Sequence, residues 1–351
     1  MLKLDGRPGA PPFLARDREA TMSEPRAAQP FIDRGLALAQ EDRLDEALDC
    51  FEQALQLDRK SAHAWYCKGC TLSSLGRHAE AASAYLECTR LAPDRTVAWY
   101  NLGNALQNLG KPDHALQCFD MVVRIDPDMA DAWINKGRLL DDSGRHQEAV
   151  DCYDEALRRA PQDVVGWANR GNSLKALGRT EEALASYRKA LEQDESHAPA
   201  LFGAADCLMA LGRDEEGLDL AGRGLQVQPG WAAGWCNRGV MLARLGRDEE
   251  ALACFEEASR RAPEEPAVWN NLAESQARLG VAEQALGSFE KALALQESYS
   301  PSWFGKGRVL LNAGRKQEAA EAFRKFLEYT APEDPLAGTV RGWLDDLGGR
   351  R

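Results

Sequence analysis

The sequence lacks any run of about eighteen apolar residues, the length that a membrane-spanning helix needs. It also lacks a stretch rich in lysine and arginine, and its formal net charge is −12. The missing basic surface argues against nucleic acid and against anionic membranes as partners. Residues 1–27 contain no continuous apolar core of the kind that a secretory signal has. We therefore expect a cytoplasmic protein that begins with a disordered leader over residues 1–27.

Cysteine gives no sign of a disulfide framework, although the chain has nine. Cys50, Cys118, Cys152 and Cys254 are separated by multiples of 34 residues, and each precedes an aromatic residue directly. Packed helices lie about 8 to 10 Å apart, beyond the roughly 7 Å between Cα atoms that a disulfide can bridge. The regular spacing therefore indicates a packing role for reduced thiols, which suits a reducing compartment.

What the chain does have is a cassette of 34 residues that recurs nine times between residues 28 and 333. Its position 8 is Gly or Ala, its position 20 is Ala or Gly, and its position 24 is aromatic in eight copies. Five copies carry proline at position 32. The fourth position is tryptophan in seven copies: Trp65, Trp99, Trp133, Trp167, Trp235, Trp269 and Trp303.

This pattern resembles the tetratricopeptide repeat (TPR), whose signature is a Trp, a Leu-Gly pair, a Tyr, and then Ala, an aromatic residue and Pro. The residues alone agree with it, because apolar positions such as Trp99, Leu102 and Leu106 recur at helical spacing. A glycine such as Gly110 stands where the first helix should end in eight of the nine cassettes, and glycine can adopt the left-handed conformation common at helix C-termini. Each copy is therefore predicted to be two amphipathic helices.

We expect an all-α, right-handed superhelix of nine helix-turn-helix repeats, with a capping helix within residues 334–351. A repeat array grows along one axis, so one elongated unit is expected. Rings at positions 4 and 24 should fill the core. The sixth copy should be the weakest joint, because it lacks the position-24 ring and has glycine at three second-helix positions. The repeats are expected at residues 28–61, 62–95, 96–129, 130–163, 164–197, 198–231, 232–265, 266–299 and 300–333.

The main functional candidate is a stripe at positions 2, 5, 6, 9, 12 and 13 of the first helices, which the resemblance places in the concave groove. Position 6 is asparagine in five copies. An amide group can donate to and accept from any peptide group. Helices about 10 Å apart would present one asparagine for about three residues of an extended ligand. The expected peptide-binding residues are Asn101, Asn104, Asn135, Arg138, Asn169, Asn172, Asn237, Arg244, Asn271, Arg278 and Arg308.

The row of asparagines is similar to the ladder in TPR superhelices that bind unstructured segments, including the recognition arm of the O-linked N-acetylglucosamine transferase family. The alternative is that these side chains bond to neighbouring repeats. Arg244, Arg278 and Arg308 suggest a ligand with acidic residues near the last three repeats. The carboxylate clamp of chaperone co-factors is not supported, because position 5 is never lysine.

The repeats leave no segment large enough for a catalytic domain, so we expect a non-enzymatic scaffold that binds a protein or peptide and needs no cofactor. One alternative is a structural assembly subunit that uses its convex surface. Another, weaker alternative is a metal or redox module at His63, Cys67 and Cys70, which share one helical stripe, with Asp33 as a fourth ligand. The partner and the oligomeric state stay open.

Overall fold

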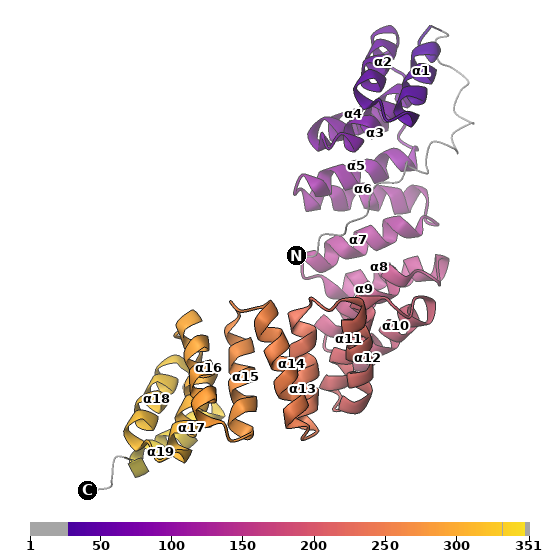
Figure 1. Ribbon diagram of the computed structural model, residues 1–351. Helices are drawn as coiled ribbons and strands as arrows, with labels where there is room; N and C mark the ends of the chain where they lie inside the picture. Colours follow the sequence, from indigo (N-terminus) through magenta and orange to yellow (C-terminus); the bar gives the residue numbers. More distant parts are fainter. Residues whose placement is uncertain (1–26, 332, 348–351) are drawn as a thin grey trace. The chain divides into compact units, whose positions relative to one another are not determined.

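The computed structural model describes residues 27–331 and 333–347, which form nineteen helices and no strand (Figure 1). Apart from its last residue, the predicted leader lies outside the described residues. The all-α fold of paired helices agrees with the prediction. Over the described ranges, no helix combines the length and apolar character needed to cross a bilayer.

The helices alternate between the first and second member of each repeat, and each first helix packs against the second helix that follows it. The first helices are α1 (Gln29–Gln40), α3 (Ala62–Ser74), α5 (Thr96–Asn108), α7 (Ala130–Asp142), α9 (Val164–Ala176), α11 (Ala198–Ala210), α13 (Ala232–Arg244), α15 (Pro266–Arg278) and α17 (Ser300–Asn312). The second helices are α2 (Leu44–Leu57), α4 (His78–Leu91), α6 (Pro112–Ile125), α8 (His146–Arg159), α10 (Thr180–Gln193), α12 (Asp214–Val227), α14 (Asp248–Arg261), α16 (Ala282–Leu295) and α18 (Lys316–Tyr329). The last helix is α19 (Pro335–Leu347).

The chain divides into two compact units rather than the single unit expected from the sequence. Unit 1 ends at Pro161 and contains α1 to α8, and unit 2 begins at Gln162 and contains α9 to α19. The division falls between α8 and α9, so each unit keeps complete helix pairs.

A left-handed residue ends each first helix, as predicted. The φ angle of Gly110 is 67°, and Asp42 takes the same place in the first repeat with φ 60°. After α5, the Gly110 N–H donates to Gln107 O at 2.9 Å, and the Lys111 N–H donates to Leu106 O at 2.9 Å. These bonds satisfy carbonyls that the helix end leaves open. The glycine thus sets the turn between the two helices.

The position-24 rings form the centre of each regular repeat. Phe119 is fully buried, and a Cβ atom on Gly103 would come within 2.9 Å of its ring. The position-4 tryptophans were expected to share this core, but Trp133 is only half-buried. Its indole Nε1 donates to Pro127 O at 2.9 Å, so it ties its helix to the preceding turn. Trp65, Trp99, Trp235, Trp269 and Trp303 make the same kind of bond.

The capping helix covers the last repeat as predicted. Val340 of α19 is fully buried. The ring of Trp343 lies 5.3 Å from that of Phe323 in α18 and 6.0 Å from that of Phe304 in α17, between centroids. The terminal apolar face is thereby removed from water, which a repeat array requires at its ends.

Candidate functional site

Two asparagines of the predicted ladder occupy consecutive first helices of unit 1, and both donate to the repeat before them. Asn101 Nδ2 donates to Tyr66 Oη at 3.3 Å. Asn135 Nδ2 donates to Tyr100 Oη at 2.9 Å and to Asn104 Oδ1 at 3.5 Å. The amide nitrogens therefore bond to a neighbouring repeat, which was the alternative that the sequence left open. The nitrogen of each side chain is used inside the protein, since Asn101 Nδ2 also lies 3.9 Å from Cys70 Sγ.

The amide oxygens of Asn101 and Asn135 remain available. Neither Oδ1 atom receives a hydrogen bond from the described residues, and both side chains are partly exposed. An amide oxygen accepts hydrogen bonds, whereas the nitrogen of each of these side chains already has two partners in the preceding repeat. In the unit 1 ladder each Oδ1 atom is thus an available acceptor, and the Nδ2 atom of the same side chain holds it in place.

An apolar pocket of about 310 Å³ adjoins Asn101 in unit 1. Tyr66, Cys70, Tyr85 and Tyr100 contribute to its wall. Burial raises the pKa of the Tyr100 phenol and of the Cys70 thiol, so both groups stay protonated at neutral pH. Sequence reasoning missed this pocket, although tyrosine at position 5 of two successive repeats was its signal.

In unit 2 two of the predicted asparagines, Asn237 and Asn172, have charged or hydroxyl partners. Asn237 Nδ2 donates to Asp206 Oδ1 at 2.6 Å, and Lys175 Nζ lies 3.0 Å from Asp206 Oδ2. Asn172 Oδ1 accepts a hydrogen bond of 2.6 Å from Tyr187 Oη. The oxygen of Asn172 is thus engaged, unlike those of the unit 1 ladder.

The remaining ladder residues of unit 2 are Asn169 in α9 and Asn271 in α15, and both are partly exposed. The side chain of Asn271 makes no hydrogen bond to the described residues. Its amide therefore keeps both functions open to a ligand.

The predicted arginines are held by partners within the chain. Arg138 donates to Gln107 Oε1 at 2.9 Å in unit 1. In unit 2, Arg244 pairs with Asp214 at 3.1 Å and Arg278 with Asp248 at 3.1 Å. Arg308 pairs with Glu274 at 3.0 Å. Their positive charge is therefore partly offset, and the basic end suggested by the sequence is weaker than the residue types imply.

The metal hypothesis finds no supporting geometry. The Cys67 Sγ atom lies 3.8 Å from His63 Nε2, and Cys70 instead receives a hydrogen bond from Asn101. The proposed fourth ligand, Asp33, accepts a hydrogen bond from Gln29 at 2.8 Å. Within the described ranges, no group of three or more His, Cys, Asp or Glu side chains is placed to hold a metal ion.

Comparison with known families agrees with the paired helices and the glycine turns. Family models for the tetratricopeptide repeat match residues 32–96, 100–164, 174–235, 232–265 and 271–337. The chain belongs to the tetratricopeptide repeat family. A search of curated proteins found no match.

Solved structures with similar folds are other TPR proteins. One from Parabacteroides merdae ATCC 43184 superposes with a TM-score of 0.53 at 18% identity, covering 72% of this chain and 99% of that one. YrrB, a TPR protein with an unusual peptide-binding site, matches with a TM-score of 0.47 at 25% identity over 52% of this chain and 94% of its own. MamA matches at 0.46 and 22% identity over 49% and 93%. The Parabacteroides merdae structure indicates a shared fold, and function is left to the residues of this chain.

Proposed function

We propose that this TPR protein is a non-enzymatic, cytoplasmic scaffold that binds an extended peptide segment along the stripe of its first helices. The observation that carries the proposal is the pair Asn101 and Asn135, whose nitrogens bond to the preceding repeat while their oxygens stay open. A peptide N–H needs an acceptor, and such an acceptor recognises backbone irrespective of side chain. Side chains fixed before binding also lose less conformational entropy when a ligand arrives.

The pocket beside Asn101 adds side-chain selectivity to this proposal. Its wall of Tyr66, Tyr100 and Leu36 is apolar, and Asn101 and Asn104 stand at its edge. An extended ligand could therefore bond to the asparagine row while placing an apolar side chain in the pocket. The ladder asparagines and arginines of unit 2 are proposed contacts of the same kind, with weaker charge selectivity because the arginines are paired.

The test starts from peptides of 12 random residues displayed on phage and selected on the wild-type protein. We expect the selected peptides to bind the variant Asn101→Ala/Asn135→Ala/Asn169→Ala at least about tenfold more weakly, a loss of about 1.4 kcal/mol. Fluorescence polarisation of labelled peptides measures this. Equal affinity for the triple variant would exclude the ladder as the binding surface.

A matched control separates binding from stability. Tyr100→Phe removes the acceptor of one Asn135 bond but keeps the ring and the Asn135 side chain. It should lower stability by about 1 kcal/mol and, because Asn135 is then less firmly held, weaken peptide binding less than Asn135→Ala does. Arg158→Ala, on the second helix α8, should change neither property because Arg158 is exposed. Loss of peptide affinity in Tyr100→Phe equal to that in Asn135→Ala would assign the asparagine a structural role only.

A further inference from the structure

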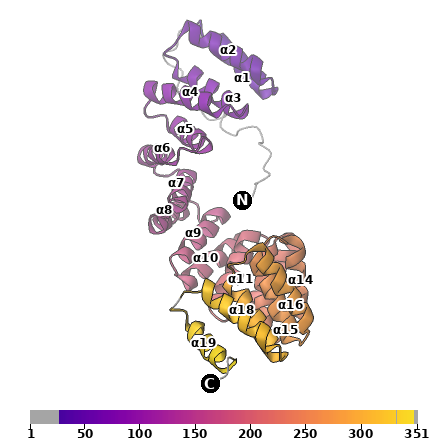
Figure 2. The same ribbon diagram turned by 90° about the vertical axis from the view of Figure 1, so that its left-hand side faces the viewer.

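An apolar furrow runs between the second helices α4 and α6 of unit 1. Its residues lie outside the groove described above. Figure 2 shows α4 and α6 on one side of unit 1, with α3 and α5 on the other. The furrow has a volume of about 740 Å³. Its walls are Ala79, Ala82, Ser83 and Leu86 of α4, with His114, Gln117, Cys118 and Met121 of α6. Its floor is Trp99, Leu102 and Leu106 of α5, with Leu109 directly after that helix.

Neighbouring repeats place an ion pair where this furrow has two leucines. At position 7 of the first helix, Lys68 pairs with Glu52 at 2.8 Å, and Lys136 pairs with Asp120 at 2.8 Å. In unit 2, Lys306 pairs with Glu290 at 3.0 Å in the same arrangement. In the third repeat Leu102 replaces the lysine, and Leu86 replaces the acidic partner. Both members of the charged pair are therefore exchanged together for apolar residues.

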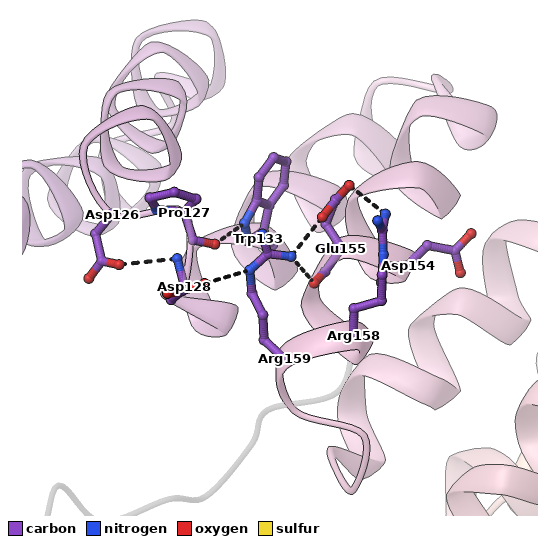
Figure 3. A network of polar contacts seen from close by, with 8 residues as sticks. All are labelled: Asp126, Pro127, Asp128, Trp133, Asp154, Glu155, Arg158 and Arg159. Carbon is purple, nitrogen blue, oxygen red and sulfur yellow. Dashed lines mark hydrogen bonds and ion pairs between the residues drawn. The ribbon is translucent and has the colours of Figure 1, made fainter.

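The exchange leaves an apolar side chain in water. Leu86 is 55% exposed, whereas Leu102 beneath it is 4% exposed. The furrow between α6 and α8 is polar by contrast, with Asp120, Lys136 and Arg145 among its lining residues. At the C-terminal end of α8, Arg159 holds Glu155 at 2.6 Å and lies 3.6 Å from Asp128, beside Trp133 (Figure 3). The exposed apolar surface thus lies between α4 and α6 and not between α6 and α8.

We propose that this furrow binds an amphipathic helix of a partner protein, which runs antiparallel to α4 and α6 and carries acidic residues in its last turn. Each wall is a face of a 14-residue helix, with lining residues at spacings of three and four. Such a furrow is about 21 Å long and matches a helix of about four turns. Leu86 supplies the apolar contact, and small residues on α4 allow close approach.

Charge at one end sets the direction of the partner helix. Lys111 precedes α6, is exposed, and makes no ion pair with the described residues. Ala79 and His114 lie in the first turns of α4 and α6, so the positive ends of two helix dipoles meet at this end. At the other end the Asp120 carboxylate already has Lys136. A partner's C-terminal end with acidic side chains therefore fits beside Lys111.

The experiment uses a synthetic 15-residue helical peptide with leucine at positions 1, 4, 5, 8 and 12 and glutamate in its last turn, as about four turns require. The protein variant Leu86→Glu/Leu102→Lys installs the ion pair of the neighbouring repeats, so it should fold. Wild-type protein should bind the labelled peptide at least about tenfold more tightly than this variant does. A peptide of the same composition without an apolar face should bind neither protein.

Two further variants keep the test decisive. Leu86→Ser changes an exposed residue and should weaken binding even if the double variant fails to fold. Lys111→Glu should weaken binding of the glutamate peptide but leave binding of a glutamine version of it unchanged.

Equal affinity of wild type and Leu86→Ser for the peptide, or no binding to wild type, would overturn the proposal. A wild-type dimer in light scattering that Leu86→Ser dissociates would also overturn it, because the occupant would then be a second copy. Asn101→Ala/Asn135→Ala should leave binding of the helical peptide intact, so the proposals for the groove and for the furrow are tested separately.

Discussion

The third repeat, in unit 1, and the sixth repeat, in unit 2, build the same helix pair from opposite choices of large and small residues. In the third, Phe119 at position 24 fills the space above Gly103 and is fully buried. In the sixth, position 24 is Ala221 and position 8 is Ala205. The ring that defines the regular repeat is therefore missing from the sixth.

Other side chains occupy the missing volume. Met241 of α13 is fully buried and packs with Ala205 and Ala221. A Cβ atom on Gly217 would come within 2.6 Å of its sulfur. Phe202 of α11 takes the space beside Gly224, and its ring lies 3.9 Å from that of Trp231, between centroids. Met241, Phe202 and Trp231 thus lie where the sixth repeat lacks its ring, and that this repeat is the weakest joint stays a prediction.

The two repeats therefore fill the space between their helices with side chains from different positions. Protein interiors are packed about as densely as organic crystals, so a lost ring must be replaced from somewhere. Met suits an irregular gap because it is unbranched and flexible. The glycines of α12 divide into those that make room for a neighbour, such as Gly224, and those with open space around them, such as Gly222.

The largest effect is expected for Phe119→Ala in the third repeat. It removes a fully buried ring, so the free energy of unfolding should fall by about 3 to 5 kcal/mol. Trp133→Ala should cost less, because that indole is half-buried. Denaturant titration followed by circular dichroism measures both. A larger loss for Trp133→Ala would reverse the assignment of the core to position 24.

A smaller loss is expected for Gly224→Ala in the sixth repeat. The added Cβ atom would lie 2.6 Å from Cε1 of Phe202, so the ring must move away from Trp231. Overpacking of this kind costs about 1 to 3 kcal/mol in the free energy of unfolding. Hydrogen exchange of α11 and α12 should rise with it. An unchanged stability would show that Phe202 has room to move, and the sixth repeat would then be loosely packed as the sequence suggested.

The smallest effect, and one of opposite sign, is expected for Gly222→Ala. No atom outside its own helix backbone and chain neighbours lies within 4 Å of the added Cβ position. Ala favours a helix interior over Gly by about 1 kcal/mol or less, so the variant should be slightly more stable. The melting temperature of Gly222→Ala beside that of Gly224→Ala measures the contrast. Similar losses in both variants would contradict the division of the α12 glycines.

Much of the fold could be predicted from the sequence because each repeat is specified locally. The glycines that end the first helices, such as Gly110, act through their own backbone conformation. The α19 cap was visible in the spacing of Val340 and Trp343. The use of Met241 in place of a position-24 ring in the sixth repeat could not be predicted, because Met241 fills a gap in the repeat before its own.

The site was harder to predict than the fold because hydrogen-bond partners come from neighbouring repeats. Asn135 was identified as a ladder residue, but its partner Tyr100 is 35 residues away in sequence. The arginines were read as open charges, yet Arg244 finds Asp214 in the preceding repeat. Residue type and helical face follow from periodicity. Only the coordinates show whether the donor or the acceptor of a side-chain amide is already used.

The recurring indole bonds also give the protein a built-in optical probe. Six tryptophans, among them Trp99 and Trp235, donate to a backbone carbonyl six residues upstream. Each indole is thereby held against the turn that precedes its helix, so its emission should shift when the junction between two repeats separates. The ring of Trp231 instead lies tilted against that of Phe202, 3.9 Å away between centroids. Tryptophan fluorescence therefore reports the opening of the junctions between repeats.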